Sequence, residues 1–275
     1  YSSASSMTID LNTGIVTGDG RDKLINIENI IGSEFNDIIT GNGLENTLYG
    51  GAGVDTLQGG LGADILNGYL EGITDSESDY VDYSYLNESS LNNGLNKVYI
   101  NLNNSGSNAT VYNELGSATT DIDKVVNIEN VLGSQNNDTI YGNAKNNIIY
   151  AGDGDDTIRA YGSTGLGYDE IDGEGGSDLL SYEYATGSVT INLNDSGTQS
   201  TGAGKIKITG IENLSGGSGS DTLTGNGDAN ILSGNSSDDT LIGNGGKDTL
   251  YGGSGNDILK GGSGNDTLDG GSNID

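Results

Sequence analysis

Apolar residues recur at every ninth position through residues 216–275. The recurring residue is always a leucine: Leu223, Leu232, Leu241, Leu250, Leu259 and Leu268. Polar residues flank most of these leucines. Because neighbouring side chains of a strand point to opposite faces, the pattern predicts a three-residue strand with one inward side chain. Glycines recur at the first, second and fourth positions of the six residues between strands. We expect them to adopt backbone angles that a Cβ would forbid, so that the chain turns tightly.

An aspartate or asparagine stands two residues before each leucine. Two nonapeptides make one coil of eighteen residues, so residues eighteen apart are expected to stack. One column would contain Asp221, Asp239, Asp257 and Asp275, and the other Asn230, Asp248 and Asp266. Carboxylates one strand spacing apart, about 4.8 Å, repel each other unless a cation lies between them. A hard cation with about six to eight oxygen ligands fits such a column, with carboxylates from two coils and backbone carbonyls around it.

The whole chain reads as three copies of a longer unit, each with a lead-in segment, an approach segment and a block of nonapeptides. The units are 1–82, 83–181 and 182–275, and their blocks are 32–67, 133–181 and 216–275. The lead-in segments alternate apolar and polar residues, at 7–12, 98–103 and 189–194. This alternation predicts a strand with one buried face.

Two of the blocks depart from strict repetition. The first loosens over residues 68–78 and returns to phase at Asp79, and the second absorbs a four-residue insertion before Gly165. We expect the insertion to form an outward loop. Because Asp275 falls at the same repeat position as Asp79 and Asp178, we also expect the chain to be a piece of a longer array.

The approach segments, at residues 27–30, 128–131 and 211–214, keep the nine-residue phase although they lack glycines at the repeat positions. We therefore expect the coil to begin one turn before the glycines do. Each segment places a glutamate at the aspartate position, and eighteen residues later stands an asparagine: Glu28 with Asn46, Glu129 with Asn147, and Glu212 with Asn230. Such a pair is either a weaker calcium site, whose glutamate reaches across a wider turn, or a hydrogen-bonded cap without an ion. The neutral asparagine favours the cap.

Composition supports a cation-dependent fold. The chain has 275 residues, 49 glycines and 32% hydrophobic residues, too few to assemble an ordinary globular core. A net charge of −30 would push a compact chain apart unless divalent cations offset it, so we expect a largely disordered chain without calcium.

Several classes of function are disfavoured by what the sequence contains. The acid excess excludes a nucleic-acid binder that relies on phosphate attraction, and no apolar run reaches membrane-spanning length. Neither cysteine nor histidine is present, and the sequence contains no H-E-x-x-H or G-x-S-x-G motif. We expect no catalytic residues and no enzyme activity.

The two cleanest nonapeptides, residues 252–260 and 261–269, fit the signature G-G-x-G-x-D-x-U-x at every position. They resemble the RTX (repeats-in-toxin) family, and the lead-in and approach segments are similar to linking cassettes between RTX blocks in large bacterial surface proteins. The resemblance implies an all-β fold, a right-handed parallel β-roll that binds calcium between its turns. It also implies export by a type I secretion system and folding outside the cell.

The resemblance also implies which residues bind the metal. The expected ligands are Asp37, Asp55, Asp64, Asp138, Asp156, Asp169, Asp178, Asp221, Asp239, Asp248, Asp257, Asp266 and Asp275. Weaker ligands or caps are Glu28, Asn46, Glu129, Asn147, Glu212 and Asn230. About eight to ten calcium ions follow, which would offset most of the net charge.

Two functions remain open from the sequence. The chain is interpreted as a calcium-dependent structural spacer of a secreted bacterial surface protein of the adhesin or S-layer type. The alternative is a secretion and folding module of an exported enzyme or toxin. Outward tyrosines at Tyr49, Tyr141, Tyr150 and Tyr251 are either ordinary exposed strand residues or a surface for lateral self-association or contact with a cell surface.

Overall fold

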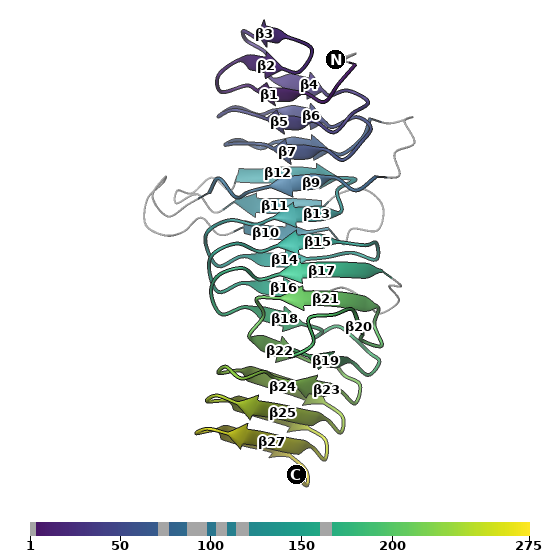
Figure 1. Ribbon diagram of the computed structural model, residues 1–275, viewed down its shortest axis with the longest axis vertical. Coiled ribbons are helices and arrows are strands. Elements are labelled where there is room, and N and C mark those ends of the chain that lie inside the picture. Colours follow the sequence, from purple (N-terminus) through teal and green to yellow (C-terminus); the bar gives the residue numbers. More distant parts are fainter. Residues whose placement is uncertain (1–3, 71–76, 87–97, 103–108, 114–120, 160–166) are drawn as a thin grey trace. The chain divides into compact units, whose positions relative to one another are not determined.

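The computed structural model describes residues 4–70, 77–86, 98–102, 109–113, 121–159 and 167–275, and the regular elements within them are all β-strands (Figure 1). The insertion expected before Gly165 and most of the loosened stretch 68–78 lie outside the described residues. The chain forms two compact units, Tyr1–Asn136 and Asn137–Asp275. The division into three sequence units stays a prediction.

The first unit contains strands β1 to β13. Their bounds are β1 Thr8–Asp10, β2 Ile15–Thr17, β3 Arg21–Lys23, β4 Asn29–Ile31, β5 Ile38–Thr40, β6 Thr47–Tyr49, β7 Thr56–Gln58, β8 Ile65–Asn67, β9 Tyr80–Asp82, β10 Val98–Asn101, β11 Ala109–Asn113, β12 Asp121–Val126 and β13 Asn130–Leu132. Within this unit one sheet runs in the order β13-β9-β7-β5-β1-β2-β3 and the other in the order β10-β11-β12-β8-β6-β4. Strands β1 to β3 and β10 to β12 pair as antiparallel hairpins, whereas the nonapeptide strands pair in parallel.

The second unit contains strands β14 to β28. Their bounds are β14 Thr139–Tyr141, β15 Ile148–Tyr150, β16 Thr157–Arg159, β17 Tyr168–Asp172, β18 Leu179–Ser181, β19 Thr190–Asn192, β20 Gln199–Ser200, β21 Lys205–Thr209, β22 Asn213–Ser215, β23 Thr222–Thr224, β24 Ile231–Ser236, β25 Thr240–Gly245, β26 Thr249–Ser254, β27 Ile258–Ser263 and β28 Thr267–Ser272. Here the strand orders are β28-β26-β24-β22-β18-β16-β14, β19-β23-β25-β27 and β20-β21-β17-β15.

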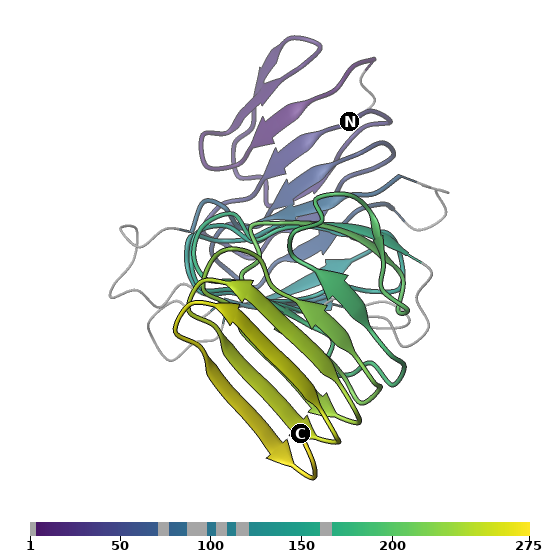
Figure 2. The same cartoon turned by 60° about the horizontal axis from the view of Figure 1, so that its bottom comes forward.

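Strand register confirms the eighteen-residue coil. Leu223 lies opposite Leu241 in the parallel pair β23 and β25, and Leu232 lies opposite Leu250 in the pair β24 and β26. These four leucines are 0% exposed, as the inward position of each strand predicts. Figure 2 shows these coils, in green and yellow, as strands stacked in parallel toward the C-terminus. The prediction of an all-β, parallel β-roll is confirmed.

The lead-in and approach segments also fold as expected. The three lead-in segments contain β1, β10 and β19, with Ile9, Ile100 and Ile191 at 0% exposure; Asn103 lies outside the described residues. The approach segments contain β4, β13 and β22. Ile30 in β4 lies opposite Leu48, and Leu214 in β22 lies opposite Leu232, so these coils do begin one turn before the glycines.

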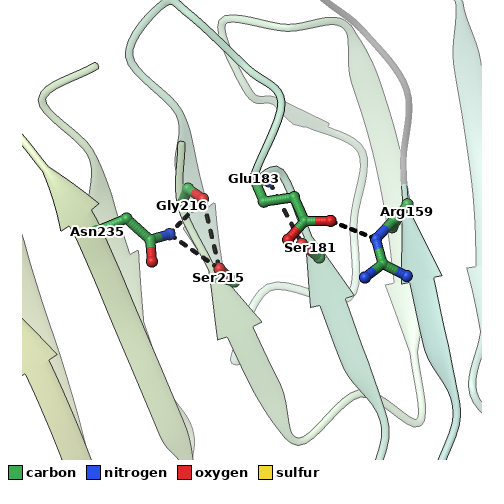
Figure 3. Close-up of polar contacts among 6 residues, drawn as sticks. All are labelled: Arg159, Ser181, Glu183, Ser215, Gly216 and Asn235. Atoms are coloured by element: carbon green, nitrogen blue, oxygen red, sulfur yellow. Dashed lines mark hydrogen bonds and ion pairs between the residues drawn. The ribbon is translucent and has the colours of Figure 1, made fainter. Parts of the chain in front are cut away.

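The outward face of the second unit carries a row of polar contacts (Figure 3). Arg159 donates from Nε to Glu183 Oε1 over 2.6 Å, and its guanidinium lies 4.8 Å from the ring centre of Tyr141. Further along the sheet, Asn235 Nδ2 donates to Ser215 Oγ over 3.0 Å and to the carbonyl oxygen of Gly216 over 2.8 Å. No helix in the described residues is long and apolar enough to span a membrane.

Candidate metal centre

Acidic side chains form vertical columns along the inner edge of the turns. In the third block Asp239 Oδ1 accepts a hydrogen bond from the Asp221 backbone N–H over 2.7 Å, and Asp257 Oδ1 accepts one from the Asp239 N–H over 2.8 Å. One carboxylate oxygen of each aspartate is therefore used to hold the preceding coil. The other oxygen remains for a different partner.

Every stack predicted between aspartate or asparagine residues eighteen apart inside a block is present. The same N–H to carboxylate step joins Asp37 to Asp55, Asn46 to Asp64, Asp138 to Asp156, Asn147 to Asp169, Asp156 to Asp178, Asp257 to Asp275, Asn230 to Asp248, and Asp248 to Asp266, over 2.6 to 3.1 Å. Their role as calcium ligands stays a prediction.

The second carboxylate oxygen is buried in several aspartates and lacks a hydrogen-bond donor. This holds among the described residues for the Oδ2 atoms of Asp156, Asp178, Asp239, Asp248 and Asp257, whose side chains are at most 4% exposed. A buried, ionised oxygen without a donor costs several kcal/mol, roughly, unless a cation or a proton compensates it.

A backbone carbonyl lies beside four of these oxygens, those of Asp178, Asp239, Asp248 and Asp257, whose repeats begin with glycine. The repeat of Asp156 begins with Ala151 instead. A Cβ atom on Gly252 would overlap Asp257 Oδ2 and lie 2.6 Å from the Gly270 carbonyl oxygen, and a Cβ on Gly243 would meet Asp248 Oδ2 and the Gly261 carbonyl in the same way. The carboxylate oxygen and the carbonyl of the next coil thus converge above the first-position glycine, where only a missing side chain leaves room.

The first-position glycine was expected to adopt backbone angles that a Cβ would forbid, and this explanation was wrong. Gly252 and Gly261 are outside the left-handed region, whereas the second and fourth positions of the same repeats are inside it, at Gly253 with φ 108° and Gly255 with φ 150°. In these repeats the first glycine allows close approach of oxygens, and the second and fourth allow the backbone conformation.

The side-chain amides of two column asparagines, Asn230 and Asn46, form hydrogen bonds with the backbone through both their oxygen and their nitrogen. Asn230 Oδ1 accepts from the Asn226 N–H over 2.8 Å, and its Nδ2 donates to the backbone oxygen of Glu212 over 2.7 Å. Asn46 makes the equivalent bonds, to the Asn42 N–H over 2.7 Å and the Glu28 oxygen over 2.9 Å. These contacts are those of a hydrogen-bonded cap. Whether Glu28 itself binds calcium stays a prediction.

The approach glutamates lie elsewhere than the sequence suggested. Glu212 Oε2 accepts from the Asp178 N–H over 2.9 Å, and Glu129 Oε2 accepts from the Asp79 N–H over 3.4 Å. Each of these two glutamate side chains thus continues the column of the preceding block, while the backbone oxygen of Glu212 accepts from the Asn230 cap. The turn ahead of Glu212 is also not wider. Asp172 pairs with Thr209, and Asp178 stands in register with Glu212, so this turn is three residues shorter than its neighbour.

Two buried aspartates were not among the expected ligands, although Asp79 was placed in phase with the repeats. Asp79 Oδ1 accepts from the Asp55 N–H over 2.8 Å, and Asp123 Oδ1 accepts from the Asp64 N–H over 2.9 Å. Both stand two residues before an inward valine, Val81 or Val125, which is the spacing that could have found them. Asp123 Oδ2 accepts from the buried Tyr83 hydroxyl over 2.8 Å.

Burial makes these carboxyl groups hard to ionise. It raises the pKa of Asp156 to about 8, helped by the negative charges of Asp138 and Asp178 and opposed by the hydrogen bond from the Asp138 backbone. Burial raises the pKa of Asp239 to about 6 against the bond from the Asp221 backbone. It likewise raises the pKa of Asp169 to about 6. Each of these groups is destabilised as a bare carboxylate.

The donor set fits calcium. Carboxylate and carbonyl oxygens are what a hard cation prefers. No three His, Cys, Asp or Glu side chains come together in the described residues, so a cation would take most of its ligands from the backbone carbonyls of the turns. The aspartates whose Oδ2 lacks a donor fit best. Asp37 and Asp221 fit less well, because Ser33 and Gly217 donate backbone N–H bonds to their Oδ2 atoms over 2.5 and 2.6 Å.

Comparison with known families shows which repeats contain the stacked aspartates. The family model of the RTX calcium-binding nonapeptide repeat matches residues 26–43, 40–70, 132–162, 209–241 and 242–275, which together cover more than half of the chain. The chain belongs to this family. The matched segments of the RTX repeat contain most of the stacked aspartates, but Asp79, Asp123, Asp169 and Asp178 lie between them. The carboxylate columns are therefore longer than the matched repeats.

RTX repeats bind calcium, so the chain is a calcium-binding β-roll. None of the curated proteins compared with it matches. The crystal structure of the extracellular lipase LipA from Serratia marcescens aligns with 67% of this RTX chain and 38% of its own, at 15% identity and a TM-score of 0.26. The chain thus spans well under half the length of that structure, and so weak a likeness says nothing of its activity.

Proposed function

We propose that this chain is a calcium-dependent structural spacer segment of a secreted bacterial surface protein, of the adhesin or S-layer type. The observation that carries the proposal is the set of buried Oδ2 atoms without donors in the turns. Such a column is unfavourable as bare carboxylates and becomes favourable when cations are coordinated between the coils.

Folding and ion binding are linked in this proposal. A net charge of −30 and a core of one inward residue per strand leave the calcium-free chain disordered. Ions that bind only the ordered coils stabilise them by mass action. Export by type I secretion would then carry an unfolded chain out of a low-calcium compartment, and folding would follow outside the cell. The spacer has no chemistry of its own.

Far-UV circular dichroism during a calcium titration tests this function. At about pH 8, where the buried carboxyl groups ionise, we expect a coil spectrum in chelator and a cooperative rise of strand signal as calcium reaches the millimolar range, with a count of about eight to ten ions at saturation. Magnesium is the control, because its preference for a small octahedral shell does not fit carbonyl-rich turns. A strand signal already complete in chelator, or one that magnesium induces equally well, would overturn the proposal.

A further inference from the structure

The junction between the second block and the third approach segment repeats the oxygen arrangement of a nonapeptide turn with different residues. A Cβ atom on Gly173 would overlap the carbonyl oxygen of Gly210 and lie 2.5 Å from Asp178 Oδ2. In the third block the same places are taken by Gly252, the Gly270 carbonyl and Asp257 Oδ2. The junction turn is three residues shorter, yet a carbonyl and a carboxylate converge on one glycine in both.

Asp178 supplies a buried oxygen that points into this junction. Its side chain is 0% exposed, its Oδ1 accepts from the Asp156 N–H over 2.8 Å, and its Oδ2 has no hydrogen-bond partner. The Glu212 carboxylate completes the group, because its Oε2 accepts from the Asp178 N–H over 2.9 Å. A carbonyl and a carboxylate oxygen without a donor thus converge at Gly173, and a second carboxylate lies next to them on the Asp178 backbone N–H.

The shortened turn explains why glutamate replaces aspartate here. Gly210 has φ 60°, which reverses the chain within two residues of Glu212 and aims its carbonyl at Gly173. With so short a turn, the backbone of residue 212 binds directly under Asp178: the Glu212 and Asn213 N–H groups donate to the Asp178 carbonyl over 3.2 and 2.9 Å. The extra methylene of glutamate lets its carboxylate reach the column.

The first unit contains the same arrangement. A Cβ on Gly68 would overlap both Asp79 Oδ2 and the carbonyl oxygen of Asn127, and Asn127 has φ 53°. Glu129 Oε2 accepts from the Asp79 N–H over 3.4 Å, and the Asn130 N–H donates to the Asp79 carbonyl over 2.9 Å. Two separate block ends in the sequence therefore meet the next approach segment in one geometry.

We propose that Asp178 and Glu212, with the carbonyl of Gly210, form a calcium site that fastens the end of the second block to the approach segment of the third. Asp79, Glu129 and Asn127 form the matching site in the first unit. The inference rests on the proposed calcium-dependent folding and adds sites that the nonapeptide pattern does not contain. Oxygen donors of this kind select a hard cation. The site keeps the carboxylate column continuous where the glycine repeats stop.

Counting bound calcium by native mass spectrometry of Glu212→Gln tests the junction site. Glutamine keeps an oxygen that can accept from the Asp178 N–H but removes the charge. We expect the variant to bind one calcium ion fewer than the unaltered chain, with its strand signal at 10 mM calcium retained. Glu183→Gln is the matched control, since Glu183 is an outward carboxylate paired with Arg159 and should leave the count unchanged.

The outcomes separate the two proposals. An unchanged ion count in Glu212→Gln overturns the junction site while leaving the proposed function intact. An unaltered chain that binds no calcium overturns both. If Glu212→Gln does not fold, Asp178→Asn is counted instead, because asparagine retains the acceptor for the Asp156 N–H. The loss of at least one ion in that variant supports the site, and an unchanged count overturns it.

Discussion

The first and second coils of the third block share one repeat pattern but differ in how their turns are held. In the first coil the backbone N–H groups of Gly217 and Asn226 point inward and donate to Asp221 and Asn230 over 2.6 and 2.8 Å. In the second coil the corresponding residues are Asn235 and Asn244, at φ 75° and 76°, and the Oδ2 atoms of Asp239 and Asp248 have no donor. The first coil is held by hydrogen bonds, whereas the second has carboxylate oxygens that the proposed calcium ions would have to satisfy.

Because of this difference, we expect the first coil to start folding and the later coils to add to it. A first coil that satisfies its own polar groups can form at the end of the lead-in strands before any ion is bound. The coils stacked on it then bring their carboxylates into register, and in the proposed function each folds as calcium or protons neutralise those carboxylates. We therefore expect the coils to fold one after another, starting from the first coil. Other repeat arrays, in which each repeat contacts only its neighbours, can fold in this way.

Protonation should have the largest effect, because it acts at once on all buried aspartates whose pKa is raised. These include Asp239 in the second coil of the third block and Asp156 in the second block. The folded-state pKa values of about 6 for Asp239 and about 8 for Asp156 lie above 3.8, their ordinary value. Between these limits the folded chain binds more protons than the unfolded chain, so stability falls as pH rises. In chelator we therefore expect strand signal near pH 4 that is lost between about pH 6 and 8.

Calcium should reverse this dependence. Protons and calcium compete for the same Oδ2 atoms, so in 10 mM calcium acid should weaken ion binding instead of promoting the fold. Circular dichroism from pH 4 to 8, with and without calcium, measures both. A chelated chain whose strand signal is constant or rises over this range would mean that the buried carboxylates do not limit folding.

Glycine substitutions in the turns of the third block give the next largest effect. Gly246, in the second coil, has φ 105°, and a Cβ there would overlap the Asp228 carbonyl. Gly227, at the third repeat position of the first coil, has an ordinary φ and open space around it, whereas the residue one coil before Gly246 is Asp228. We expect Gly246→Ala to destabilise the calcium-bound chain by roughly 2–3 kcal/mol, and Gly227→Ala to be neutral or to stabilise it by about 0.5 kcal/mol. Urea unfolding in 10 mM calcium compares them, and equal effects would refute the need for a left-handed glycine at position 246.

Much of the fold could be predicted because the nine-residue period reports register directly. Leu223 and Leu241 are eighteen residues apart and lie opposite each other. The conformation of the turns could not be predicted. Gly217 and Gly253 occupy the same repeat position, yet only Gly253 has a positive φ. Gly217 lies against the carbonyls of Tyr182 and Ala185, in an irregular turn, whereas Gly253 lies on a nonapeptide turn at Asn235.

The missed site residues have a similar explanation. Asp123 reaches its column from an antiparallel hairpin 59 residues beyond Asp64, so no repeat spacing connects the two. Glu212 was found at the right repeat position, and its backbone oxygen does accept a hydrogen bond from Asn230. Its side chain, however, has a different neighbour from the one expected. The eighteen-residue interval pointed to Asn230, whereas the shortened turn brings its side chain to Asp178. A fixed period predicts stacking inside a block and does not predict what happens where blocks join.

Changing Asn230 to aspartate should have the smallest of these effects on stability. It tests most directly whether residue type or turn conformation distinguishes the first coil from the second. If the residue type decides, Asn230→Asp creates a second-coil type of column and binds one more calcium ion. If the turn conformation decides, the new carboxylate behaves like Asp221: the Asn226 N–H donates to it, and the ion count is unchanged. We expect the second result. The only loss is the bond from Asn230 Nδ2 to the Glu212 carbonyl, so the chain should be destabilised by about 1 kcal/mol in urea unfolding at 10 mM calcium. A gain of one ion in native mass spectra would show that the sequence of the column, and not the backbone of its first coil, determines where calcium binds.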